Sequence, residues 1–77
     1  MTAPDPVSWK VVEPGWRVLG PSGKELGTVD EVLGDAEADI FHGLSVASGL
    51  LARRTEVPAE RVSEIREGEV VLDGDTV

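Results

Sequence analysis

The sequence predicts an all-β fold, either a barrel or a sandwich, built as one domain. Segments rich in Val, Leu and Ile recur about every ten residues after Gly15, which is the spacing of short strands in such folds. Turn-forming residues separate these segments, and they stand at 21–23, 34–35, 48–49, 67–68 and 73–74. A chain of 77 residues has room for a single hydrophobic core.

The first two strands are expected at 16–19 and 26–33. A Gly-Pro-Ser-Gly turn follows the first strand and predicts a hairpin, because Pro fixes φ and Gly accepts a positive φ. The second strand does not alternate strictly. Gly27 and the three-residue spacing between Leu26 and Val29 predict a bulge or a bend there.

The third and fourth strands show clearer alternation. In the third strand, at 40–46, alternate side chains lie on opposite faces. One face carries Ile40, His42, Leu44 and Val46, and the other carries Phe41 and Gly43. In the fourth, at 50–57, the adjacent Arg53 and Arg54 leave opposite faces. This arginine pair predicts an edge strand protected by charge, in preference to an anion site.

The segment that follows has both helical and strand features. Pro58 suits a first helical position, and Val62 and Ile65 have helical spacing, but Val57 offers no side-chain acceptor for a cap. We therefore predict one helical turn from Pro58 to Arg61. Two closing strands should follow at 62–65 and 70–72, joined by the turn at 67–68.

Three stretches together resemble the PRC-barrel family, which is named for the cytoplasmic domain of the photosynthetic reaction-centre H subunit and includes the C-terminal domain of the ribosome-maturation factor RimM. These stretches are GWRV at 15–18 leading through PSGKE to LGTVDEV at 26–32, DIFHGLSV at 39–46, and VPAERV at 57–62. The resemblance implies a PRC-type β-barrel of about six strands over residues 15–72. A flexible arm at 1–14 and an acidic tail at 73–77 would flank it.

The resemblance also implies a function through protein contacts and no enzymatic activity. The N-terminal RNA-associated domain of the maturation factor and the membrane helix of the H subunit have no counterpart in this sequence, so neither role is carried over. The net charge of −8 opposes direct binding to nucleic acid. With no membrane-spanning apolar run and no signal peptide, we expect a cytoplasmic protein.

Few residues suggest a catalytic or metal-binding role. Asp35, Glu37 and Asp39 alternate like the start of a calcium loop, but Ile40 and Val46 replace the Gly and Glu that such a loop needs. A solvated acidic loop is the preferred interpretation, and a weak cation site is the alternative. His42 has no neighbouring nucleophile, and the chain has no Cys. We predict no catalytic residue, no metal site and no cofactor.

The three aromatic residues are the predicted interaction anchors. Trp16 and Phe41 fall within the barrel pattern, and we favour a core position for Trp16. Trp9 lies outside the pattern, where packing on the barrel and packing on a second subunit are equally compatible with the sequence. Large rings with a polar edge suit both roles.

These observations lead us to expect a non-enzymatic protein-interaction or assembly module. A core this small barely offsets the entropy of folding, so we also expect a homodimer that pairs sheet edges or apolar faces. A further protein partner is expected, although the sequence does not identify it. The alternatives are a small-ligand or cation-binding barrel, suggested by the acidic loop and His42, and a ribosome-associated accessory factor, suggested by the resemblance alone.

Overall fold

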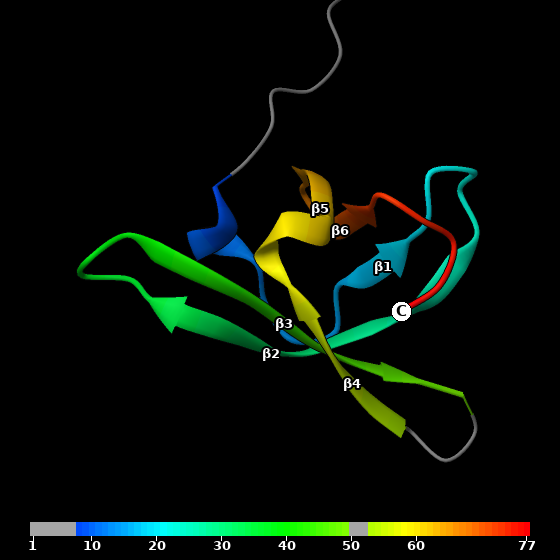
Figure 1. Ribbon diagram of the computed structural model, residues 1–77, viewed down its shortest axis with the longest axis horizontal. Coiled ribbons are helices and arrows are strands. Elements are labelled where there is room, and N and C mark those ends of the chain that lie inside the picture. Colours follow the sequence, from blue (N-terminus) through cyan, green and yellow to red (C-terminus); the bar gives the residue numbers. More distant parts are fainter. Residues whose placement is uncertain (1–7, 50–52) are drawn as a thin grey trace, which may run out of the picture.

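The computed structural model describes residues 8–49 and 53–77, and the all-β prediction is confirmed (Figure 1). It contains six strands and two short 3-10 turns in this part of the chain: η1 (Trp9–Val11), β1 (Arg17–Leu19), β2 (Glu25–Asp35), β3 (Ile40–Ser48), β4 (Arg53–Pro58), η2 (Ala59–Arg61), β5 (Val62–Arg66) and β6 (Glu69–Leu72). No helix in the ranges 8–49 and 53–77 has the length and apolar character needed to cross a bilayer.

The strands form one curved sheet in the order β4-β3-β2-β1-β6-β5. Neighbouring strands are antiparallel except for β1 and β6, which run parallel. In Figure 1 the long β2–β3 hairpin crosses the molecule and the β5–β6 hairpin folds over it. Within the described residues β4 and β5 are the two ends of this order, so the sheet curves around its core without a hydrogen-bonded closure.

The core fills the concave side of the sheet with branched aliphatic side chains. Every strand except β5 contributes a fully or nearly fully buried residue, and the cluster consists of Val12, Val18, Val29, Leu44, Val46, Val57, Val70 and Leu72. Among the described residues no polar or charged residue is buried. The interior of the sheet is therefore a packed apolar layer.

Both predicted flanking segments contact the sheet where they are described. Residues 1–7 of the predicted arm lie outside the described residues, whereas Val12, in its second half, is a core residue. In the predicted tail, Asp73 accepts a hydrogen bond from the Arg61 side chain, and the Arg61 guanidinium also donates to the Thr76 carbonyl at 2.7 Å. Val77 packs against the core.

The bulge predicted in the second strand is confirmed. Strand β2 has two irregular positions, one at Leu26 opposite β1 and one at Asp30 opposite β3. Each inserts one unpaired residue and bends the strand. The bulge at Asp30 lets Val29 and Val32 both face the core at a spacing of three.

The predicted alternation of the third strand is wrong at its start. Gly34 pairs with Phe41 and Leu33 with Gly43, so His42 is an extra residue that has no partner on β2. This bulge reverses the faces before it: Phe41 packs against the core, whereas Ile40 is 47% exposed and His42 is exposed. Beyond the bulge, Leu44 and Val46 point inward as predicted.

The helical turn predicted from Pro58 to Arg61 is confirmed as η2, with Pro58 at the N-cap. The fourth strand begins at Arg53 in the structure, and residues 50–52 of its predicted range lie outside the described residues. The closing strands at 62–65 and 70–72 correspond to β5 and β6, each one residue longer than predicted.

Candidate functional site

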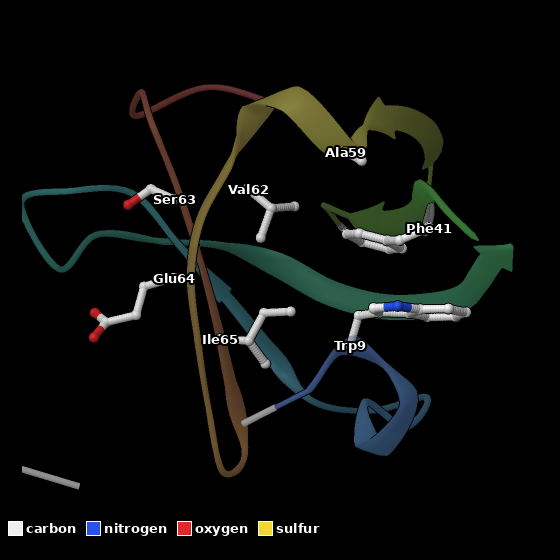
Figure 2. Close-up of a pocket in the computed structure, with 7 residues that line it drawn as sticks. All are labelled: Trp9, Phe41, Ala59, Val62, Ser63, Glu64 and Ile65. Atoms are coloured by element: carbon white, nitrogen blue, oxygen red, sulfur yellow. The ribbon is translucent and has the colours of Figure 1, made fainter. Parts of the chain in front are cut away.

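The structure contains a groove of about 540 Å³ between the first turn, the start of β3 and the edge strand β5. Figure 2 shows that two aromatic rings form one wall and that aliphatic side chains of β5 point toward them from the other. The lining residues are Trp9, Phe41, Ala59, Val62, Ser63, Glu64 and Ile65. The groove thus lies along the outer edge of β5, which pairs with β6 alone among the described residues.

The aromatic wall is a stacked pair. The rings of Trp9 and Phe41 have centroids 5.3 Å apart and planes inclined by 15°. Gly34, the partner of Phe41 on β2, lies under the indole: a Cβ at this position would come within 3.1 Å of two ring carbons of Trp9. The absence of a side chain at Gly34 therefore lets the indole lie flat across the hairpin. Such aromatic pairs stabilise by about 0.5–1.5 kcal/mol beyond their burial.

A polar contact fixes the outer edge of the indole. Trp9 Nε1 donates to Asp39 Oδ1 at 3.2 Å, and Lys10 Nζ lies 3.5 Å from the same oxygen. Ser8 supports this arrangement, because its hydroxyl caps η1 by accepting from the Lys10 amide at 3.2 Å. The apolar face of the ring is consequently left to the groove while its N–H is satisfied at the rim.

The opposite wall depends on an irregularity of β5. Val62 pairs with Leu72 and Glu64 with Val71, so Ser63 is an extra residue in the strand. Because of this bulge Val62 and Ile65 share one face, pointing toward the aromatic rings, while Ser63 and Glu64 point away (Figure 2). In the described part of the chain β5 pairs with β6 alone. Its outer backbone N–H and C=O groups are therefore open to another strand.

One charged residue, Glu64, is among the lining residues, and its side chain points away from the aromatic rings (Figure 2). Glu64 accepts a hydrogen bond from Arg66 Nε at 2.9 Å, and this carboxylate raises the pKa of Arg66 above its usual value. Arg66 also lies 3.8 Å from Glu69, which in turn pairs with Arg17. These ion pairs link the three neighbouring strands β5, β6 and β1, and most of the other residues that line the groove are apolar.

The structure brings together two of the three predicted anchors. Trp9 and Phe41 form the aromatic wall, whereas Trp16 is half-buried against the core and does not line the groove. Sequence reasoning did not identify the β5 wall. Its signal was the i, i+3 spacing of Val62 and Ile65, which a bulged strand produces as well as a helix does.

The acidic loop uses its carboxylates for local contacts. Asp35 Oδ1 accepts from the amides of Glu37 at 3.0 Å and Ala38 at 3.3 Å, and Asp39 binds the indole of Trp9. In the ranges that the structure describes, no three His, Cys, Asp or Glu side chains gather as a metal site would need. His42 lies exposed at its bulge.

No protein-family model matches this chain, and no curated protein matches it either. The resemblance to the PRC-barrel family stays a prediction.

Proposed function

We propose that this protein is a non-enzymatic interaction module that binds an extended, positively charged segment of a partner protein along the groove. The observation that carries the proposal is the stacked pair of Trp9 and Phe41 facing the outer edge of β5, an edge that pairs with no strand in the described part of the chain. A bound segment would add a strand to β5 through its backbone and place apolar side chains against the rings.

The two walls serve different parts of recognition. Main-chain hydrogen bonds along β5 supply affinity for any extended chain, whereas the pocket between the rings and Val62 and Ile65 selects apolar side chains at alternate positions. Aromatic residues in a partly preformed pocket are frequent energetic centres of protein interfaces. The rings of Trp9 and Phe41 are already packed, so little ordering accompanies binding.

Charge favours a basic partner. The chain carries a net charge of −8, and carboxylates of Asp39 and Glu64 stand at or beside the groove. A negative field of this kind accelerates the approach of positive segments and disfavours acidic ones. The resemblance to PRC-barrel proteins, whose members act through protein contacts, supports the same class of function and a cytoplasmic location.

The test begins with a displayed library of random peptides selected on the full chain. Selected peptides should be rich in Lys or Arg and in apolar residues. When titrated into the ¹⁵N-labelled protein, they should shift the amides of β5 and the indole N–H of Trp9. Selection of acidic peptides, or shifts confined to other strands, would contradict the proposal.

Two lysine variants provide a matched comparison. Val62→Lys places a charge in the groove, whereas Val11→Lys adds the same charge at an exposed valine that does not line it. We expect the first variant to weaken peptide binding about tenfold or more and the second to change it little. Equal effects of the two variants would show that net charge alone governs binding.

A second candidate is the binding of a small apolar molecule, because a groove of about 540 Å³ falls within the size range of small-molecule sites. Such a ligand would also be sensitive to Val62→Lys. It would not, however, protect the backbone amides of β5 from hydrogen exchange, and this measurement separates the two candidates.

A further inference from the structure

The second free edge of the sheet, β4, has a pattern of charges that fits a second copy of itself. In the described part of the chain β4 pairs with β3 alone, and the two strands project together from the rest of the molecule (Figure 1). Arg53, Arg54 and Glu56 are exposed along β4, and Thr55 between them is half-buried. The outer backbone groups of β4 are thus available to another strand.

We propose that two copies of the chain associate by antiparallel pairing of β4 with β4, about a two-fold axis at Thr55. Directly opposite residues in such a pair lie on the same face of the sheet. This register places Arg54 of each copy opposite Glu56 of the other and brings the two Thr55 side chains together. Opposite charges and Thr–Thr pairs at directly opposite positions both stabilise antiparallel sheets.

The charge pattern selects this register over its neighbours. A two-fold axis perpendicular to a continuous sheet passes midway between the two strands, so that one residue lies directly opposite its own symmetry mate. An axis at Arg54 would place two guanidinium groups opposite each other, and an axis at Glu56 would do the same with two carboxylates; like charges in these positions are destabilising. Thr55 lies between these two residues. Of the three registers, only the one with its axis at Thr55 places unlike charges opposite each other.

The existing contacts of β4 leave this pairing possible. Arg54 lies 3.4 Å from Asp30 of its own chain, yet its side chain is 72% exposed and can reach a second carboxylate. Within residues 8–49 and 53–77 Glu56 has no ion-pair partner. Association would cover one edge of each sheet, and an isologous contact of this kind closes at two copies.

The inference concerns a different surface from the groove. β4 and β5 are opposite ends of the strand order, so pairing through β4 leaves the β5 edge open. Dimer formation and peptide binding are therefore measured separately. A dimer that binds no peptide would contradict only the proposed function, and a monomer that binds peptide would contradict only the dimer. The pairing involves only six residues on each side, so we expect a concentration-dependent dimer and not a permanent one.

Charge reversal with sedimentation equilibrium is the first test. Arg54→Glu and Glu56→Arg should each raise the dimer dissociation constant about tenfold or more, because each variant places like charges opposite one another at two sites. The double variant should restore association, since it exchanges the two charges. Lys24→Glu and Glu67→Arg make the same changes of charge at exposed turns and should leave the constant unchanged.

Cysteine cross-linking is the second test, and the chain has no native Cys to interfere. Thr55→Cys places one thiol beside its symmetry mate, so mild oxidation should give a disulfide-linked dimer. Ser63→Cys, on the other free edge, should not cross-link. A wild-type chain that stays monomeric at high concentration, failure of the double variant to restore association, or cross-linking through position 63 but not 55 would overturn the proposal.

Discussion

Trp9 and Phe41 stack with their ring centroids 5.3 Å apart, which joins the segment before the first strand to the start of the third. The contact closes one side of the groove and fixes the first turn, η1, onto the β2–β3 hairpin. The stack therefore links the stability of the chain to its proposed binding surface.

Replacement of Phe41 tests the bulge at His42 together with the stack. Phe41→Ala should lower the free energy of unfolding by about 2 kcal/mol, because a half-buried ring loses its contacts with Trp9 and the core. Ile40→Ala is the matched control and should lower it by less than about 1 kcal/mol, since Ile40 faces solvent. Denaturant unfolding measures both values. A larger effect at Ile40 would mean that the strand alternates without the bulge.

A methyl group at Gly34 should displace the indole. The new Cβ would lie 2.4 Å from the Ile40 carbonyl oxygen and 3.1 Å from the Trp9 ring. We expect Gly34→Ala to destabilise the fold by about 1–3 kcal/mol and to shift tryptophan emission to longer wavelength. In the control Gly74→Ala, the added carbon meets the flexible end of Arg61 at 3.3 Å, and emission should not change. Unchanged emission in Gly34→Ala would show that the ring does not rest on this residue.

Asp39 combines an unusual backbone conformation with the contact to Trp9. Its φ of 56° lies in the left-handed region, which Asn and Asp tolerate better than branched residues do. Asp39→Asn keeps both the conformation and an acceptor for the indole, and it should change stability by less than about 0.5 kcal/mol, because the Lys10 pair is exposed. Asp39→Val should be destabilised by about 1–3 kcal/mol. Thermal unfolding of the two variants measures this difference. Equal stability of Asp39→Asn and Asp39→Val would show that the backbone at this position is not strained.

Arg61 holds the C-terminal segment against the sheet. Its guanidinium bonds to Asp73 Oδ1 at 3.0 Å and to the Thr76 carbonyl at 2.7 Å. Arg61→Gln should therefore cost about 1–2 kcal/mol of stability and speed hydrogen exchange at 73–77. Lys24→Gln removes a charge from an exposed turn and should do neither. Exchange that is equally fast in the wild-type chain and in Arg61→Gln would mean that the tail is not held by this residue.

The order of the strands along the chain and the turns between them follow from local patterns. The positions of Pro and Gly predicted the hairpins and the η2 turn. Pro restricts φ and Gly permits positive φ whatever residues surround them. Alternation located Leu44 and Val46 in the core, since period two needs only a strand with one buried face.

The tertiary structure decided where that alternation is interrupted. His42 and Ser63 are ordinary residues in sequence, yet each is an extra position in its strand, and these bulges turn Phe41, Val62 and Ile65 toward one groove. A bulge is set by how two strands fit across a curved sheet, so its position depends on pairing between distant residues. For the same reason the sequence indicated Trp9 as an anchor, but only the folded chain placed it on Gly34 and Phe41.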